Sequence, residues 1–228
     1  MLNEIKKEIL LANQWVVEKG LVEMTWGNVS FFCKEANKVL IKPSGIDLDM
    51  AIADDISVTT LDGKALSGRK PSVDLPTHLE IYKNFDNVSC VVHTHSKYAT
   101  IFAQAGLNIP CLGTTHSDYF YGDVPCIPHP SRKEVQQDYE LHTGRKICNF
   151  FKKNKINHQQ VQACVIVGHG VFSWGRTVQK ALENAYVLEV VSEMAYKTLL
   201  LNRDTNLSTY IVDKHFLRKN GENKYYGQ

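Results

Sequence analysis

The sequence lacks any run of about 20 consecutive apolar residues, the length that a membrane-spanning helix requires. Charged residues occur within the first eight positions, so the start of the chain lacks the apolar core of a secretory signal peptide. The six cysteines are scattered and include no Cys-x-x-Cys pair, a pattern typical of reduced thiols. Together these absences predict a cytoplasmic protein that does not act at a membrane.

The chain also lacks an excess of either charge. It has 26 Lys and Arg against 24 Asp and Glu, and the formal net charge of +2 is not concentrated in a basic block. This balance argues against nucleic acid as a partner, whereas a small anionic substrate needs only a few local cations. Neither a Gly-rich dinucleotide fingerprint nor a Walker phosphate loop is present, and no segment repeats.

Hydrophobic periodicity predicts alternating helices and strands. The expected helices cover 2–19, 76–85, 97–105 and 178–202, with one more starting at a Ser-x-x-Glu capping box at 131–134. The expected strands lie within 25–32, 38–42, 56–61, 88–95 and 162–167, and several follow one another at hairpin spacing. Because no linker-like segment divides the 228 residues, we expect a single-domain α/β sandwich over 1–228, with a central mixed or largely antiparallel sheet flanked by helices.

The sharpest motif is His93-Thr94-His95 at the end of an apolar strand. Residues two apart in a strand point to the same face, so two imidazoles can converge on one ion at about 2.0–2.1 Å each. A third histidine, His169, follows another apolar strand and lies between two glycines that remove side-chain bulk. Three imidazoles with an open position are typical of a catalytic divalent-metal site. The chain has nine histidines, so spacing alone leaves ordinary histidines as an alternative.

Residues suited to anion binding follow a predicted strand. Lys42-Pro43-Ser44-Gly45 offers a cation, a hydroxyl and backbone N–H groups, the parts of an anion-binding nest. Asn28 and Ser72 could add side-chain donors. A simple Pro-Ser-Gly turn is the alternative.

Two acidic residues and the C-terminus are harder to assign. Asp74 precedes a predicted helix and could simply cap it or face its dipole. Asp118 lies in an aromatic-rich loop, where it could be a turn residue. The segment from His215 onward would by default be a frayed tail, but Tyr225 and Tyr226 leave apolar area exposed unless they dock on something.

Eight motifs occur in a fixed order along nearly the whole chain. They are Thr25-Trp26-Gly27-Asn28-Val29-Ser30, Ile41-Lys42-Pro43-Ser44-Gly45, 74–78, His93-Thr94-His95-Ser96, Gly113-Thr114-Thr115-His116, 118–123, Gly168-His169-Gly170, and 214–219 with Tyr225-Tyr226-Gly227-Gln228. Together they resemble the class II aldolase/adducin family, and most closely its sugar-phosphate 4-epimerases.

The resemblance implies a role for each matching residue. His93, His95 and His169 would hold a divalent metal, usually zinc and alternatively an ion such as Mn²⁺, with Asp74 as a weaker fourth ligand or nearby carboxylate. The substrate phosphate would be bound by Asn28, Lys42, Ser44, Gly45 and Ser72.

The resemblance also implies an assembly. Asp118 and Tyr226 would form the acid/base pair, and His215 and Arg218 would reach the substrate from a neighbouring subunit. The family assembles as a homotetramer with sites at subunit interfaces, so the aromatic tail would dock on the next protomer.

The implied reaction is epimerisation at C4 of L-ribulose 5-phosphate to D-xylulose 5-phosphate. Inverting a carbon that bears no acidic proton needs oxidation or carbon–carbon cleavage, and metal-assisted cleavage and re-addition across C3–C4 needs no nicotinamide. The alternatives are a family aldolase that releases its fragments, a non-enzymatic adducin-like structural protein, and a structural zinc protein. Family aldolases carry a Glu base where this chain has the shorter Asp74, which favours the epimerase.

One position departs from the epimerase pattern. The epimerases read Pro-Ser-Ser-Asp, whereas this chain has Pro71-Ser72-Val73-Asp74 and loses a hydroxyl at Val73. A neutral hydrogen bond contributes about 0.5–1.5 kcal/mol, so we expect weaker phosphate binding rather than loss of the site.

Overall fold

The molecule is built on one eight-stranded sheet. The computed structural model describes residues 2–226, so Gly227 and Gln228 of the C-terminal motif lie outside the described range. Along the sheet the strands follow the order β4-β3-β2-β1-β5-β8-β7-β6. Their bounds are β1 Gly27–Cys33, β2 Lys38–Ile41, β3 Ser57–Thr60, β4 Ala65–Ser67, β5 Cys90–Thr94, β6 Cys126–Ile127, β7 Ala163–Ile166 and β8 Val171–Gly175. Of the pairs between these strands, β6 with β7 is parallel and the others are antiparallel.

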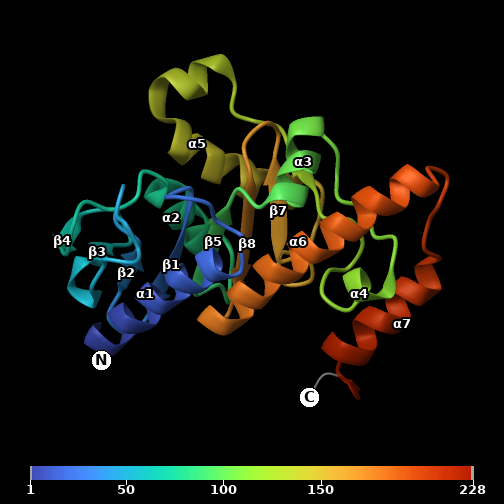
Figure 1. Cartoon of the computed structure of the whole chain (residues 1–228), viewed down its shortest axis with the longest axis horizontal. Coiled ribbons are helices and arrows are strands. Elements are labelled where there is room, and N and C mark those ends of the chain that lie inside the picture. The colour runs from blue at the N-terminus through green and yellow to red at the C-terminus, as the bar shows by residue number, and fades with distance from the viewer. Residues whose placement is uncertain (1, 227–228) are drawn as a thin grey trace.

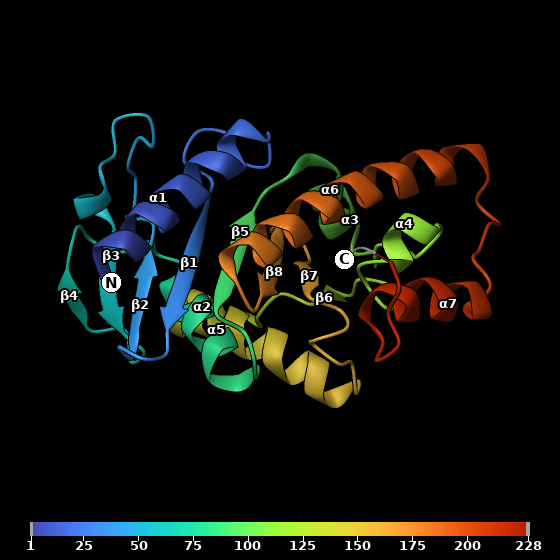
Figure 2. The same ribbon diagram turned by 90° about the horizontal axis from the view of Figure 1, so that it is seen from below.

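Helices cover both faces of the sheet. In the view from below, α1 and α6 lie on one side and α2 and α5 on the other (Figures 1 and 2). The helices are α1 Leu2–Glu18, α2 Leu75–Asn84, α3 Lys97–Ala105, α4 Thr114–Ser117, α5 Arg132–Lys153, α6 Val178–Leu201 and α7 Thr209–Asn220, with a 3-10 turn at Ala53–Asp55. This arrangement confirms the predicted α/β fold with a mixed, largely antiparallel sheet flanked by helices.

Alternating side chains of the central strands enter two separate cores. Val91 of β5 packs into the core under α2 and α5, whereas Cys90 and Val92 pack into the core under α1. In β2, Val39 and Leu40 are divided between the two cores in the same way. Because a strand places successive side chains on opposite faces, a strand buried on both sides can be apolar at consecutive positions, as Cys90, Val91 and Val92 of β5 are.

The predicted elements are largely confirmed, with boundaries shifted by at most two residues. The capping box forms: Glu134 N–H donates to Ser131 Oγ at 3.4 Å, and Ser131 N–H donates to Glu134 Oε2 at 2.7 Å. Strand β8 was not predicted, because its five residues are all buried and show no alternation. The one-turn helix α4 was not predicted either.

The interpretation of the C-terminus as a frayed tail by default was wrong. Residues Thr209–Asn220 form α7, which packs on α4 and buries Phe216 to 5% exposure. The backbone N–H groups of Tyr225 and Tyr226 then donate to the Arg218 carbonyl at 2.9 and 3.1 Å. Phe216 is the one buried residue of α7, whereas Tyr210 and Leu217 are exposed, so the apolar residues of this helix do not follow a period that predicts one buried face.

Two sequence expectations concern thiols and membranes. All six cysteines are free, and five of them are buried. Among the described helices, none has the length and apolar character needed to cross a bilayer.

His116, which belongs to one of the motifs, is a structural residue. It is 3% exposed, and its Nε2–H donates to the Gly122 carbonyl at 2.9 Å. Its ring also meets Phe120 edge-on, with centroids 5.6 Å apart. Burial lowers the pKa of His116 to about 4, with the Gly122 bond opposing the shift, so the folded protein holds this imidazole neutral.

We therefore predict that His116 makes the free energy of unfolding depend on pH. Below pH 6.5 the unfolded chain protonates this residue while the folded chain stays neutral down to about pH 4. Its contribution to stability is thus complete above pH 6.5 and falls by up to about 1.4 kcal/mol per pH unit on acidification through that window. Urea unfolding of the metal-free protein at pH 7, 6 and 5 measures the slope. His116→Gln should show a shallower slope than the native chain, and an unchanged slope would contradict this assignment.

Candidate functional site

Two strand pairings bring three histidines together. His93 is the penultimate residue of β5, which pairs with β8 so that His93 lies opposite Phe172 and Thr94 opposite Val171. His169 lies in the turn that joins β7 to β8, and His95 follows β5 directly. One ligand nitrogen from each of these histidines lies within 4.8 Å of the other two. The sequence prediction that these residues converge is therefore confirmed, although His95 lies just beyond the strand rather than in it.

The imidazoles are arranged to offer lone pairs. The carbonyl of Val171 can only accept, so His93 Nδ1 donates to it at 2.8 Å and leaves His93 Nε2 unprotonated. Burial lowers the pKa of His93 and His95, and it lowers that of His169 to about 3, so all three are neutral near pH 7.

The spacing of these nitrogens suits a metal ion. His93 Nε2 and His95 Nε2 are 3.2 Å apart. Two nitrogens bound to a tetrahedral zinc at about 2.0–2.1 Å lie roughly 3.3 Å apart, so the observed separation fits shared coordination. The nearest ring centroids lie 4.9–5.2 Å from one another. The donor set therefore fits a divalent transition metal bound through imidazole nitrogens.

Asp74 faces this cluster rather than capping its helix. It occupies the N-cap position of α2, but its side chain makes no capping hydrogen bond. Instead, Asp74 Oδ2 accepts from Asn28 Nδ2 at 2.7 Å and from Ser72 Oγ at 3.3 Å. Burial alone would raise the pKa of Asp74, but its interactions with His93 and His78, and then with Asn28, outweigh burial and lower it. An ionised carboxylate beside three neutral imidazoles complements a divalent cation.

The predicted anion-binding residues adjoin Asp74. The loops at 42–45 and 70–72 pair with each other, because Ser44 N–H donates to Lys70 O at 3.0 Å and Ser72 N–H donates to Lys42 O at 3.1 Å. Asn28 Nδ2 also donates to Ser72 Oγ at 3.1 Å, which joins these loops to β1. Gly45 has φ +64, a left-handed conformation that favours glycine.

Lys42 is the cation of this group and is 3% exposed. Its Nζ donates to the Thr25 carbonyl at 3.2 Å. Burial lowers the pKa of Lys42, while the charge of Asp74 raises it. This segment is therefore more than a turn, since it places a buried ammonium near the carboxylate that faces the histidines. Val73, where the hydroxyl is lost, is 58% exposed.

The remaining predicted residues form a second cluster. Arg218 Nε and Nη2 donate to the two carboxylate oxygens of Asp118 at 3.1 and 3.0 Å. His215 Nδ1 lies 3.2 Å from Asp118 Oδ1, and the Arg218 guanidinium carbon lies 4.2 Å from the centre of the Tyr226 ring. His215 and Arg218 thus contact Asp118 of their own chain, and the expectation that they reach the substrate of a neighbouring subunit stays a prediction.

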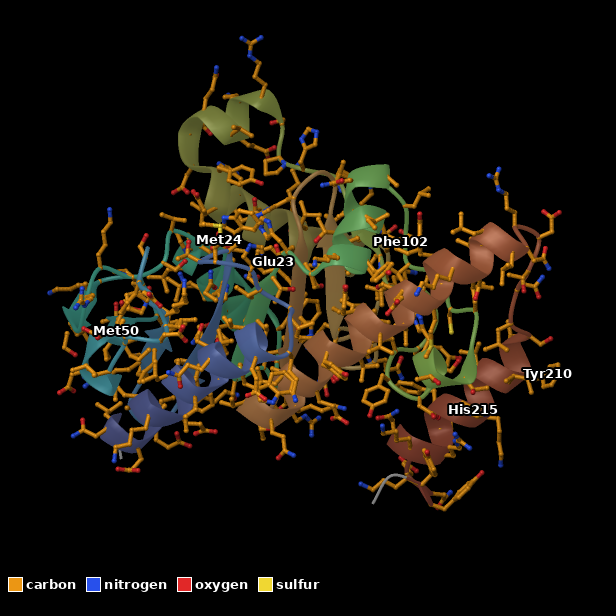
Figure 3. All side chains as sticks on the ribbon, in the orientation of Figure 1. Glu23, Met24, Met50, Phe102, Tyr210 and His215 are labelled. Atoms are coloured by element: carbon orange, nitrogen blue, oxygen red, sulfur yellow. The ribbon has the colours of Figure 1, made fainter. Side chains whose placement is uncertain are left out.

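This second cluster lies apart from the histidines within one chain. It is built from α7 and the end of α4, and α4 lies between α6 and α7 in both views (Figures 1 and 2). His215 lies at the end of the molecule opposite Met50 (Figure 3). Within residues 2–226, no hydrogen bond, ion pair or ring contact joins this second cluster to the three histidines.

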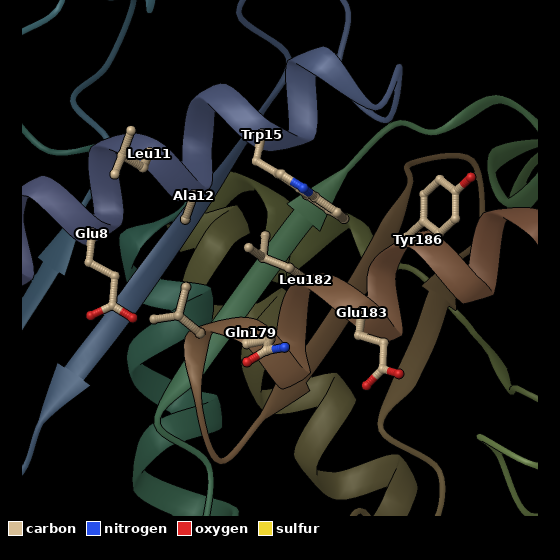
Figure 4. Close-up of a pocket in the computed structure, with 9 residues that line it drawn as sticks. Glu8, Leu11, Ala12, Trp15, Gln179, Leu182, Glu183 and Tyr186 are labelled. Atoms are coloured by element: carbon tan, nitrogen blue, oxygen red, sulfur yellow. The ribbon is translucent and has the colours of Figure 1, made fainter. Parts of the chain in front are cut away.

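An apolar groove of about 510 Å³ between α1 and α6 is separate from both clusters (Figure 4). Trp15 and Tyr186 meet across it edge-on, with ring centroids 6.1 Å apart. The residues that line it include no member of the predicted site.

Comparison with known proteins identifies the fold family. The sequence model of the class II aldolase and adducin N-terminal domain matches residues 7–196. The chain belongs to the class II aldolase and adducin family. The matched range contains the three histidines, Asp74 and the 42–45 loop, whereas α7 lies outside it.

Solved structures share the family fold. An L-fuculose 1-phosphate aldolase superposes with a TM-score of 0.79 at 21% identity, covering 93% of this chain and 94% of that one. YgbL from Klebsiella pneumoniae, a suggested aldolase, epimerase or decarboxylase, gives 0.76 at 23% identity, covering 94% and 98%. An L-fuculose 1-phosphate aldolase from Glaciozyma antarctica gives 0.74 at 17% identity, covering 94% and 80%. At these identities the likeness shows the fold alone.

Tyr139 was not predicted to contribute to the site of this aldolase/adducin domain. Its hydroxyl lies 3.0 Å from His169 Nδ1, the partner that orients the ring of a metal ligand. The backbone of α5 is non-helical at Asp138, with φ −161 and ψ 90, directly before Tyr139. A lone tyrosine in a polar helix carries no sequence signal for such a contact.

Glycine is required at position 170 because of two specific contacts, whereas the sequence predicted only a general need for space around His169. A Cβ there would lie 2.7 Å from the Thr94 carbonyl oxygen and 2.8 Å from His95 Cδ2. Both distances are shorter than carbon atoms tolerate, so any side chain would displace His95.

We predict that Gly170→Ala weakens zinc binding by about 10–100-fold, the usual effect of disturbing the groups that orient metal ligands. Competition between the metal-free protein and a chelating dye measures the affinity. Gly113→Ala is the matched control, because nothing lies within 4 Å of a Cβ at that position. Equal zinc affinity in both variants would show that Gly170 does not position His95.

Proposed function

We propose that this member of the family is a divalent-metal-dependent sugar-phosphate enzyme that epimerises L-ribulose 5-phosphate at C4 to D-xylulose 5-phosphate. The main support for this proposal is that a group of metal-binding residues lies next to a group of anion-binding residues. Three neutral imidazoles and Asp74 fit a metal, and Lys42, Ser44, Gly45 and Ser72 adjoin them through Asn28. A sugar phosphate requires both groups, because its carbonyl and hydroxyl oxygens can bind a metal while its phosphate binds the cation and N–H donors.

His93, His95 and His169 would hold the ion, zinc or another divalent metal, with Asp74 as the fourth ligand or nearby charge. When bound, the ion supplies Lewis acidity toward the C2 carbonyl and C3 hydroxyl oxygens. Lys42, the Ser44 hydroxyl and the Gly45 N–H would bind the phosphate through charge-assisted hydrogen bonds. The phosphate anchor would keep the C4–C5 fragment in place after C3–C4 cleavage, so that it can rotate and recombine with its opposite face.

Asp74 supports epimerisation over simple aldol cleavage. Hydrogen bonds from Asn28 and Ser72 hold its carboxylate beside the imidazoles, so its short side chain is suited to binding a metal rather than to reaching a substrate carbon. Proton transfer would then fall to Asp118 and Tyr226, with His215 and Arg218 at the substrate. Bidentate pairing with Arg218 fixes the orientation of Asp118.

Because this acid/base cluster lies apart from the histidines in one chain, we propose that it completes the site of a neighbouring copy. A homotetramer with active sites at subunit interfaces provides that arrangement. We further propose that the enzyme acts in the cytoplasm on a free sugar phosphate, without nucleic acid or membrane.

We predict that zinc-loaded protein converts L-ribulose 5-phosphate to D-xylulose 5-phosphate, followed by ¹³C NMR. Chelation and His95→Asn should each lower the rate by more than about 100-fold, because each removes the Lewis acid. His129→Asn, a matched change at an exposed histidine, should leave the rate unchanged. Accumulation of dihydroxyacetone and glycolaldehyde phosphate would instead support the fragment-releasing aldolase. Absence of turnover with metal bound would reject this substrate.

A further inference from the structure

A cleft of about 540 Å³ lies next to the Asp118 cluster, because Asn220 Nδ2 in its wall donates to the Asp118 carbonyl at 3.0 Å, but it shares no residue with either cluster described above. Its walls come from the loop before β7, the turn from β8 into α6, the first turn of α6, and the end of α7. The lining residues used below are Gln159, Gln162, Arg176, Lys180, Lys219 and Lys224. None of the residues proposed to bind metal or sugar phosphate lines it.

The ionised residues of this basic cleft are all cations. Arg176, Lys180, Lys219 and Lys224 line it, and no Asp or Glu is among the lining residues. The carboxylate of Glu183 lies just behind them, 3.0 Å from Lys180 Nζ. One carboxylate therefore balances one of these cations at contact distance.

Two other cations have neutral partners. Arg176 Nη2 donates to Gln159 Oε1 at 2.8 Å, and Lys219 Nζ lies 3.3 Å from the centre of the Tyr119 ring. Burial lowers the pKa of Lys219, and the charge of Lys180 lowers it further, although Glu183 opposes both. Arg176 and Lys219 consequently keep positive charge toward the cleft, since these two partners are neutral.

Neutral groups in the wall also retain donors. Gln162 Oε1 accepts from Asn184 Nδ2 at 2.9 Å, which leaves the Gln162 amide hydrogens to donate. Thr177 Oγ1 accepts from Lys180 N–H at 3.1 Å, so its hydroxyl hydrogen also remains. These donors surround the N-terminus of the 24-residue helix α6, which itself favours negative charge.

We propose that the basic cleft is a second ligand site, which binds a small phosphorylated metabolite carrying at least two negative charges. Arg176 and Lys219, the two cations with neutral partners, match two negative charges on the ligand. The volume of the cleft fits a small molecule rather than an extended polyanion. The basic cleft shares no residue with the proposed metal and sugar-phosphate sites, although its wall residue Asn220 donates to the carbonyl of Asp118.

Isothermal titration with fructose 1,6-bisphosphate tests the proposal on the full, zinc-loaded chain. Lys42→Met is used as the background, so that the candidate sugar-phosphate site contributes little. One bisphosphate should bind per chain, and adding Arg176→Gln with Lys219→Gln should weaken binding at least tenfold. The matched control adds Lys34→Gln with Lys64→Gln, which removes the same charge from two exposed hairpin turns and should change the affinity less than twofold.

Absence of binding in the Lys42→Met background would overturn the proposal, as would equal weakening by the cleft and control pairs. A second measurement needs no variant. Acetylation of lysines in the native protein, read by mass spectrometry, should slow several-fold at Lys180 and Lys219 when the bisphosphate is present. Unchanged labelling of both lysines at saturating bisphosphate would also overturn it.

Discussion

The antiparallel pairing of β5 with β8 is the constraint on which the site depends. It places His93 opposite Phe172, so the turn that carries His169 arrives beside the end of β5. The same pairing brings Gly170 against His95 so closely that no side chain fits between them. A register shift of one residue would turn His93 to the other face of the sheet and separate the three imidazoles. The two apolar cores, one on each face, oppose such a shift because β5 contributes alternate side chains to both.

Burial and neighbouring charges shift the pKa values of the site residues in opposite directions. Burial keeps His93, His95 and His169 neutral and therefore able to bind a metal, while Asp74 stays ionised through its neighbours. Lys42 is buried nearby with its pKa lowered by burial and raised by Asp74. In a low-dielectric setting each of these charges has a large effect on its neighbours. The metal-binding and phosphate-binding residues are thus linked electrostatically. Hydrogen bonds through Asn28 and Ser72 also connect the two groups.

Much of this arrangement could be predicted from the sequence, because local patterns encode it. His-x-His at a strand end and a histidine between glycines predict ligands through the two-residue period of a strand. Other features depend on packing between distant segments. Asp118 pairs with Arg218 across 100 positions, and Tyr139 meets His169 only because α5 is irregular at Asp138. Asp74 illustrates a case in which the local pattern allowed two roles, and only the positions of Asn28 and Ser72 show that it does not cap α2.

We propose that His93, His95 and His169 bind one divalent ion together, and the rest of the site depends on this. X-ray absorption at the zinc edge of the loaded protein measures the ligands directly. We expect one zinc per chain, with about three imidazole nitrogens at 2.0–2.1 Å and the remaining positions filled by oxygen. In His169→Asn the imidazole signal should fall by one third or the zinc should be lost. Sulfur ligands at about 2.3 Å, or a native spectrum unchanged by that substitution, would show that these three histidines do not bind the ion together.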